Sequence, residues 1–411
     1  MSQVSTLDIT AIAAGGDGVA RHEGLVVFVP RTAPGDRARV RVQPKGRFAR
    51  GTLVALEQPS PSRVAPPCVH YERDRCGGCQ LQHLSLAAQR AAKAQIVHDA
   101  FTRIAKRDVP LPEVRGAGDG WRYRRKLTLA MRRTRDGWMA GMHRAGAPDE
   151  LVPIDDCHIT DASVVAGFRD VLASAAPLLP NAPSLRLAIR RAGDDLLCVV
   201  EGGLRWREAA AFAEAVPSLA AVWWVTDEGR RTLVLDRRAS YTAGASFVQV
   251  NEAVAAMLAE HAVACAMRHT PATIVDGYAG TGDVAAMLHA RGVRVTAIEL
   301  DADAADVCGR RLTAPSAVVT ARVEDALPSA LPADVVLLNP PRAGVDAQVA
   351  ATLSAAAVKP RAIIYVSCDP ATLARDVARL PGYTIASLTC FDMFPQTAHV
   401  ETVCELVAEA P

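Results

Sequence analysis

From residue 250 onward the chain alternates short apolar runs with segments of helical spacing, and this pattern restricts the fold more than any other feature. The apolar runs that precede a helix-like segment lie at 272–276, 293–299, 333–339 and 361–367. Such alternation predicts a parallel sheet with helices on both faces, the doubly wound α/β fold. The last two runs, 383–391 and 399–408, leave no room for a helix between them, so we expect them to pair antiparallel at one edge.

The front of the chain has a different pattern. Residues 5–57 alternate β-rich runs with turn signals, which predicts five short strands in a small OB-like β-barrel, and a Pro- and Ser-rich stretch follows at 58–62. Between the barrel and the α/β unit we expect a mixed α+β region, with a helix over Ser85–Lys106 and an Arg-rich strand over Trp121–Met131. The predicted domains are therefore 1–58, 59–245 and 246–411.

Charge is divided along the chain although the net charge is only +2. Residues 1–150 carry 25 Lys and Arg against 14 Asp and Glu, whereas residues 151–411 carry 21 against 30. A basic front predicts that the N-terminal portion meets a polyanion such as a nucleic acid. On the barrel alone, a solvated basic face explains the same residues equally well.

The N-terminus has no basic segment followed by an apolar run, and no 18 apolar residues run together. We therefore expect a cytoplasmic protein without a membrane span. In that compartment the ten cysteines are expected to be thiols, metal ligands or nucleophiles rather than disulfides.

A glycine-rich turn follows the first strand of the α/β unit, with the sequence DGYAGTGD at 276–283, and the second strand ends in Glu299. Glycines let a backbone approach a ligand at a helix N-terminus, and a carboxylate one strand over accepts hydrogen bonds from ribose hydroxyls. This combination predicts an adenosine nucleoside but does not distinguish NAD from S-adenosylmethionine. A tight strand–helix turn with no ligand is the simpler alternative.

The later strands end in reactive side chains. One ends in Asn339-Pro340-Pro341-Arg342, in which the prolines fix an extended turn that aims Asn339 into the cleft. Another ends just before Cys368, a candidate nucleophile, although a buried small apolar side chain is the alternative there. Glu401 alternates with apolar residues in the last strand, so it is either salt-bridged or a base with a raised pKa.

Cysteines also gather outside the α/β unit. Cys68, Cys76 and Cys79 fall within twelve residues, and two glycines separate the last two. This spacing is typical of a metal knuckle, and with a distant fourth thiol such as Cys157 it suits either zinc or a [4Fe–4S] cluster.

Taken in order, the glycine motif, NPPR at 339–342, SCDPAT at 367–372 and FPQTAHVE at 394–401 resemble the RNA (uracil-5)-methyltransferases over essentially the whole chain. The barrel resembles the TRAM domain of the branch that acts on 23S rRNA. The resemblance implies that Cys68, Cys76, Cys79 and Cys157 hold a [4Fe–4S] cluster, with zinc less favoured. It also implies S-adenosylmethionine as the methyl donor.

The resemblance assigns roles to residues of the α/β unit. It implies that Cys368 adds to carbon 6 of a flipped uridine and that Glu401 removes the proton from carbon 5. The segment Phe247-x-Gln249-x-Asn251 resembles the family's cofactor-contacting stretch. The residues that the resemblance places on the cofactor are Gln249, Tyr278, Asp283, Glu299 and Asn339.

Two positions depart from the family pattern, which has Asp at the position of Asn339 and Asn at that of Asp369. The second exchange adds a charge beside Cys368 and would raise its pKa. Three alternatives stay open: a tRNA substrate, an amino-group methyltransferase in which Arg342 replaces the usual aromatic residue, and an RNA-binding assembly factor on an inactive fold. We expect a monomer.

Overall fold

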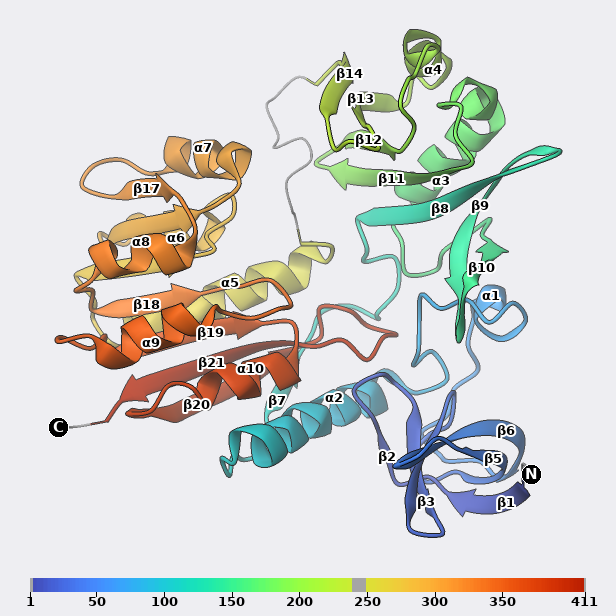
Figure 1. The fold of residues 1–411 in the computed structure, drawn as a ribbon, viewed down its shortest axis with the longest axis horizontal. Coiled ribbons are helices and arrows are strands. Elements are labelled where there is room, and N and C mark those ends of the chain that lie inside the picture. The colour runs from blue at the N-terminus through green and yellow to red at the C-terminus, as the bar shows by residue number, and fades with distance from the viewer. Residues whose placement is uncertain (1–2, 239–248, 410–411) are drawn as a thin grey trace.

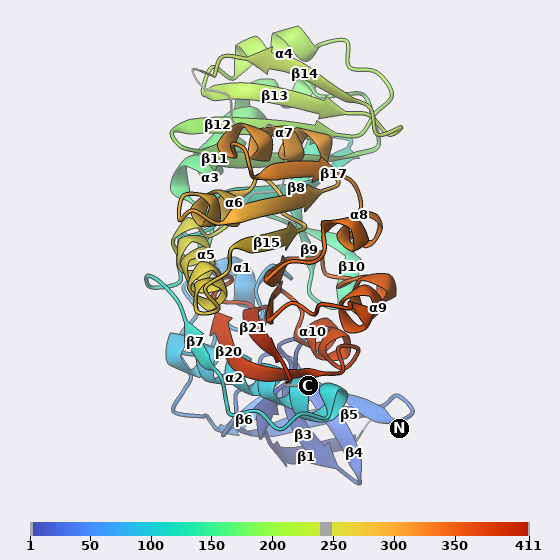
Figure 2. The same ribbon diagram turned by 90° about the vertical axis from the view of Figure 1, so that its left-hand side faces the viewer.

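The computed structural model describes residues 3–238 and 249–409. Figure 1 shows three sheets, with the C-terminal α/β unit on the left, the middle sheet at the upper right and the small N-terminal sheet at the lower right, and Figure 2 shows them turned by 90°. Helix α2 runs along the underside of the α/β unit in Figure 1, on the side of the N-terminal sheet. Within the described ranges no helix is long and apolar enough to cross a membrane.

Residues 3–58 form a curled sheet of six strands, in the order β1-β5-β6-β4-β3-β2. The strands are β1 (Gln3–Asp8), β2 (Ala11–Ile12), β3 (Gly18–His22), β4 (Leu25–Val29), β5 (Arg37–Pro44) and β6 (Phe48–Gln58). The predicted number was five, because the two-residue strand β2 is too short to show a period in the sequence. Strand β5 alternates exposed arginines with buried Ala38, Val40 and Val42, so its basic residues face solvent.

The middle sheet has the order β10-β9-β8-β11-β12-β13-β14. Its strands are β8 (Lys126–Thr134), β9 (Gly137–Arg144), β10 (Ala147–Pro153), β11 (Ser184–Ala192), β12 (Asp195–Glu201), β13 (Leu219–Val225) and β14 (Arg231–Asp236). One face packs against α3 (Ala162–Asp170), the short turns η2 (Val171–Ala175) and η3 (Ala176–Leu178), and α4 (Ala209–Ala215). The predicted strand over Trp121–Met131 was wrong in its first half, because Arg122 has a left-handed backbone and the chain is extended in this sheet only from Lys126.

The C-terminal sheet confirms the doubly wound prediction. In the described residues its order is β17-β16-β15-β18-β19-β21-β20-β7, and β21 runs antiparallel to both of its neighbours. The strands are β15 (Thr273–Gly277), β16 (Arg294–Glu299), β17 (Ala317–Thr320), β18 (Val335–Leu338), β19 (Ala362–Ser367), β20 (Tyr383–Phe391) and β21 (Glu401–Ala408). One face is covered by α5 (Glu252–Met267), α6 (Asp283–His289) and α7 (Ala302–Arg311). The other is covered by α8 (Val323–Ala330), α9 (Ala347–Ala355) and α10 (Pro370–Val377).

Part of the segment that the sequence assigned to the central domain lies with this C-terminal sheet. After the short α1 (Val69–Glu72), helix α2 (Leu86–Ala100) begins at its N-cap Ser85 and continues as the turn η1 (Phe101–Ala105), as its spacing predicted. Val97 and Phe101 are buried in the same core as α10 and β20. Strand β7 (Glu113–Arg115) then pairs in parallel with Thr389–Phe391 of β20. The antiparallel pair β20–β21 is confirmed, but β7 and not β20 forms the edge of the sheet.

Candidate active site and cysteine cavity

The glycine turn after β15 depends on backbone conformations that few side chains tolerate. Tyr278, Gly280 and Gly282 all have positive φ, at 62°, 57° and 78°. A Cβ added at Gly282 would lie 2.3 Å from the Sγ of Cys308, whereas one added at Gly280 would meet no atom within 4 Å. Gly282 is therefore required by both conformation and packing, while Gly280 leaves open space beside the backbone.

Glu299, at the carboxyl end of β16, holds this turn. Its Oε2 accepts a hydrogen bond from the backbone N–H of Gly280 at 2.7 Å, and its Oε1 accepts one from Asp301 at 2.8 Å. The motif also begins with a buried carboxyl that sequence reasoning passed over. Burial, and next the charge of Glu299, raise the pKa of Asp276 to about 7. The sequence feature that could have revealed Asp276 is a carboxyl within the apolar run 272–276.

Asn339 and Tyr278 lie at the same end of the sheet as Glu299. The backbone N–H of Asn339 donates to the carbonyl of Gly277 at 3.2 Å, and its side chain is exposed at the rim. Tyr278 is half-buried, and burial raises its pKa to about 12. Asp283, in contrast, is exposed at the start of α6 and forms an ion pair with Arg311 at 2.5 Å.

The segment before α5 carries one polar atom that suggests a ligand. The Oε1 of Gln249 is buried and, among the described residues, has no hydrogen-bond partner. Asn251 is used structurally, because its side chain caps α5 through the N–H of Val254. Phe247, the first residue of this predicted segment, lies outside the described residues.

Cys368 and Glu401 are brought together by sheet register. Strand β19 ends at Ser367, which pairs with Thr402 of β21, so Cys368 follows one strand where Glu401 begins the other. Burial raises the pKa of Glu401 to about 7, against an opposing effect of Arg342. The pKa of the half-buried Cys368 thiol is raised first by burial and then by Glu401, and it is lowered by Arg342. The carboxyl of Glu401 therefore acts on the thiol of Cys368 at the rim of the sheet.

Arg342 is a further candidate site residue. From the sequence it served only as an argument against an amino-group methyltransferase. It stands directly after the two prolines that follow β18, is exposed, and is the positive charge that lowers the pKa of both Cys368 and Glu401. It also contributes, after burial, to lowering the pKa of His399. The sequence feature that could have pointed to Arg342 is its position directly after two prolines at the end of a predicted strand.

Asp369 has a local structural function. It is the N-cap of α10 and its Oδ1 accepts from the backbone N–H of Thr372 at 2.8 Å. Asp and Asn are both strong N-caps, so this departure from the family pattern preserves the helix start. Its charge raises the pKa of Cys368 in the predicted direction, but it contributes less than burial, Glu401 and Arg342.

The four cysteines Cys68, Cys76, Cys79 and Cys157 all line one cavity of about 50 Å³ outside the α/β unit, and none is in a disulfide. Burial, and to a smaller extent the neighbouring thiols, raise the pKa of Cys76 to about 11 and that of Cys79 to about 12. In the ranges that the structure describes, no three His, Cys, Asp or Glu side chains are already arranged to hold a metal ion. The cavity thus gathers four free thiols around a space rather than around a single point.

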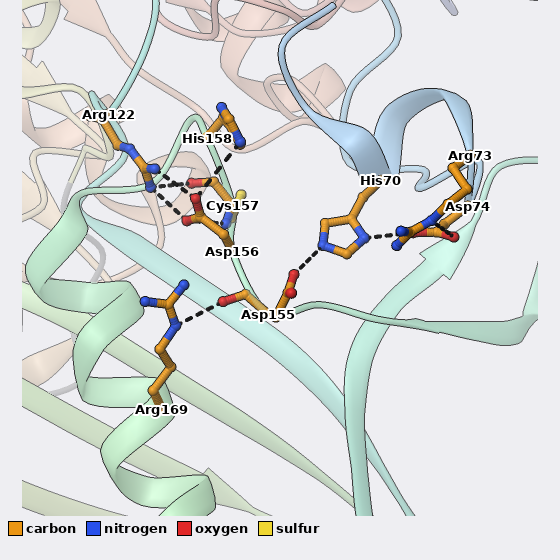
Figure 3. Close-up of polar contacts among 9 residues, drawn as sticks. All are labelled: His70, Arg73, Asp74, Arg122, Asp155, Asp156, Cys157, His158 and Arg169. Atoms are coloured by element: carbon orange, nitrogen blue, oxygen red, sulfur yellow. Dashed lines mark hydrogen bonds and ion pairs between the residues drawn. The ribbon is translucent and has the colours of Figure 1, made fainter.

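Charged side chains hold the Cys157 segment to the loop that carries the other three cysteines. Figure 3 shows His70 between two carboxylates, with Nδ1 2.7 Å from Asp74 and Nε2 2.6 Å from Asp155. On the other side of Cys157, Arg122 donates two hydrogen bonds of 2.8 Å to Asp156. Distant parts of the sequence are therefore joined at this cavity by hydrogen bonds that involve no cysteine thiol.

Comparisons with known proteins agree with this geometry. The model of the tRNA (Uracil-5-)-methyltransferase family matches residues 320–408, and that of the TRAM domain matches residues 2–54. An uncharacterized RNA methyltransferase of Protochlamydia amoebophila is 32% identical over 97% of this chain and 96% of its own. The 23S rRNA (uracil(1939)-C(5))-methyltransferase of Chromohalobacter salexigens is 32% identical over 98% of this chain and 90% of its own.

A solved structure shares the fold along the whole chain. It is the tRNA (uracil-54, C5)-methyltransferase of Pyrococcus abyssi in complex with S-adenosyl-L-homocysteine. The TM-score is 0.72 at 23% identity, with 98% of this chain and 99% of the other covered.

Proposed function

This chain belongs to the RNA (uracil-5)-methyltransferase family, and on that premise we propose that it methylates carbon 5 of a uridine in 23S rRNA through a covalent intermediate on Cys368. Membership of the family makes it an S-adenosylmethionine-dependent RNA methyltransferase. The observation that carries the proposed mechanism is the register of β19 and β21, which sets Cys368 beside the buried Glu401. The proposal extends to a monomer acting in the cytoplasm.

In this proposal Cys368 begins the reaction, because carbon 5 of uracil is a poor nucleophile. The thiolate adds to carbon 6 of a flipped uridine, and the electron pair moves through carbon 5 to the O4 carbonyl as an enolate. S-adenosylmethionine supplies an electrophilic methyl group, which carbon 5 takes. Glu401 then removes the carbon-5 proton, the C5–C6 double bond forms again, and the C6–S bond breaks to release the thiolate.

The surroundings suit the proposed roles of both groups. A base works best with a pKa near the working pH, and burial brings the pKa of Glu401 to about 7. Arg342 opposes the effect of burial on the pKa of Cys368, so it increases the fraction of thiolate at neutral pH.

The residues around the glycine turn fit S-adenosylmethionine. Glu299 keeps unused lone pairs for ribose hydroxyls while it holds the turn, and the open space beside Gly280 lets a ligand approach the backbone. The unpartnered amide oxygen of Gln249 would accept a hydrogen bond from the ligand. Tyr278 and Asn339 would shape the same pocket. Asp283 is kept as a cofactor-binding residue only because of the family resemblance, since its carboxylate already forms an ion pair with Arg311.

The proposed domains follow the same division. Residues 1–58 and the basic part of 59–245 would bind RNA, and 246–411 would carry the chemistry together with α2 and β7. The excess of arginine at the front of the chain supports phosphate contacts.

For the cysteine cavity we propose a [4Fe–4S] cluster held by Cys68, Cys76, Cys79 and Cys157. All four free thiols face one cavity, and a cluster is a body that ligands surround, whereas a single zinc ion draws its sulfur ligands to about 2.3 Å from one point. Bound iron would supply the positive charge that these thiols need to ionise. Methyl transfer moves no electrons, so the cluster's contribution would be structural.

Two experiments test the proposal. Mass mapping of RNA from a strain without the gene should show 5-methyluridine lost from 23S rRNA. A loss from tRNA instead would favour the alternative that the Pyrococcus abyssi fold relative suggests.

RNA containing 5-fluorouridine should trap the enzyme through Cys368, and an assembly factor on an inactive fold would give no adduct. Full activity of Cys368→Ala would instead support amino-group methylation.

A further inference from the structure

The connection from β20 to β21, residues 392–400, carries the chain into Glu401, and side chains from the front of the sequence hold it in place. At its centre is Gln396, which is 3% exposed and has a left-handed backbone with φ of 70°. A residue other than glycine keeps this conformation only where its surroundings enforce it. The shape of this connection therefore depends on what contacts Gln396.

The contacts of Gln396 come from residues 80–89. Its carbonyl accepts from the backbone N–H groups of Gln80 and Leu81, at 3.0 and 2.9 Å. Its own N–H donates to the side-chain Oε1 of Gln89 at 2.8 Å, and its side-chain Oε1 accepts from the Nε2 of Gln89 at 2.9 Å. Gln89 thus uses both ends of its amide on this single residue.

Gln89 is itself fixed. It lies on α2, is 1% exposed, and its Nε2 also donates to the carbonyls of Leu81 and Leu84, at 3.1 and 2.9 Å. The same amide therefore ties the loop after Cys79 to the connection that leads to Glu401. Because Gln89 is buried, it does not face the RNA or the methyl donor.

A second anchor lies one helical turn further along α2. Lys93 donates to the carboxylate of Asp392 at 2.5 Å and to the carbonyl of Phe394 at 3.0 Å, and the side chains of Lys93 and Asp392 are fully buried. Residues four apart on a helix share a face, so α2 holds the connection at two points on one side.

We propose that Gln89 is a positioning residue that holds Glu401 at the distance needed for proton removal from carbon 5, an inference that rests on the proposed function. Its specific effect is on the last step, in which the proton moves to the Glu401 carboxylate, the C5–C6 double bond forms and the C6–S bond to Cys368 breaks. Thiolate addition and methyl transfer depend on Cys368 at the end of β19. The side-chain hydrogen bonds of Gln89 that the structure describes go to Leu81, Leu84 and Gln396, so they hold the connection and not β19. Loss of Gln89 should therefore slow release more than addition.

The test uses Gln89→Leu in the full-length enzyme, with Gln95→Leu as the matched control. Gln95 is the same residue type on the same helix, but it is exposed and bonds only to Asp99 in the contacts that the structure describes. On ordinary uridine RNA in a single turnover, Gln89→Leu should release product about 10- to 100-fold more slowly and accumulate a denaturant-stable adduct. On 5-fluorouridine RNA, which blocks release, its rate of adduct formation should stay within about threefold of the wild type. Gln95→Leu should match the wild type in both.

Two outcomes would overturn the inference: equal slowing of addition and release, or no change in either. If Gln89→Leu does not fold, Gln396→Leu removes the same side-chain bond from the other partner and should show the same split. Where both single variants fold, the double variant should be no slower than the slower of the two, because both substitutions remove one interaction. If the wild type itself forms no adduct with 5-fluorouridine RNA, the proposed function fails and not the positioning role.

Discussion

Two sites in this molecule are built from cysteine, and they place the same thiol group in opposite settings. Cys368 is a single half-buried thiol at a strand end, with a carboxylate and an arginine beside it. Cys68, Cys76, Cys79 and Cys157 line a cavity together, and each of the first three has its pKa raised chiefly by burial.

The difference lies in what would ionise each thiol. At Cys368 the protein supplies its own positive charge through Arg342, so a thiolate can form and leave during a reaction cycle. In the cavity burial is the main cause of the raised pKa of Cys68, Cys76 and Cys79, and neighbouring thiols add to it, so these three would ionise only when a positively charged body binds. One arrangement suits a transient bond to carbon and the other suits permanent bonds to iron.

The largest expected effect is on Cys368. Replacing it with alanine should lower methyl transfer by at least about 10⁴-fold, because the covalent step has no other nucleophile. The adduct with 5-fluorouridine RNA should also disappear. Cys390→Ala is the control, since Cys390 is a buried thiol of the same sheet and lies within the core; it should lose some stability and keep the chemistry. A Cys368→Ala enzyme that still forms the adduct would place the nucleophile elsewhere.

Glu401→Gln should lower turnover by about 10²- to 10⁴-fold while leaving thiolate addition possible. The adduct should therefore persist on ordinary uridine RNA, which gel electrophoresis in denaturant would detect. If turnover and adduct both vanish, Glu401 acts before release.

Glu401→Gln should also be more stable than the wild type at alkaline pH. The folded-state pKa of Glu401 is about 7, above that of an unfolded glutamate, so ionising it in the folded protein becomes increasingly costly from about pH 4 to pH 7. Glutamine removes this cost, and the unfolding free energy at pH 8 should rise by on the order of 2 kcal/mol. Denaturant melts at pH 8 and pH 4 measure it, and the gain should be absent at pH 4. An equal gain at both pH values would mean that burial does not raise the pKa.

Cys79→Ala tests the other half of the comparison. The protein should lose its iron and its absorbance near about 400 nm, and melt at a lower temperature. Methyl transfer should fall by only about tenfold, through the neighbouring contacts of Gln80 and Leu81 with Gln396. Cys198→Ala, at a buried cysteine of the middle core, should keep the iron. A colourless wild-type protein purified without oxygen would count against iron at this site.

The smallest expected effect is that of Arg342→Gln. Without this charge the pKa of Cys368 and that of Glu401 both rise, so the pH–rate profile should move to higher pH. Activity at pH 7 should fall by about three- to tenfold and recover by about pH 9. Arg291→Gln, at an exposed arginine just before the start of β16 and so at the strand ends opposite to the rim that carries Cys368, should leave the profile in place. An unchanged profile in Arg342→Gln would mean that the thiolate needs no arginine.

Much of the C-terminal unit could be predicted because its chemistry lies at strand ends. Apolar runs mark the strands, the fold type sets their direction, and Glu299 and Cys368 therefore had to lie at the ligand-binding rim. The placement of Glu401 near Cys368 needed the additional fact that β21 runs antiparallel to β19.

Other features leave no local trace in the sequence. Arg342 matters because of where its side chain reaches after two prolines, and spacing does not report that. Gln89 reads as a polar residue on an amphipathic helix, since its partner Gln396 lies 307 residues away. Trp121–Arg125 has the composition of a strand, yet backbone bonds of Arg122 and Arg124 to His158 and Ile159 draw it into a loop.

The placement of β7 has a consequence for how the chain can be divided and assembled. Its three residues close the edge of the catalytic sheet beside β20, although about two thirds of the chain separates the two strands. A fragment beginning at residue 246 would leave β20 as a bare edge strand, which invites pairing with other copies and aggregation. During synthesis β7 and α2 cannot take their places in this sheet until β20, near the end of the chain, has been made. The catalytic sheet is completed only when a segment from the first third of the sequence meets one of its last strands.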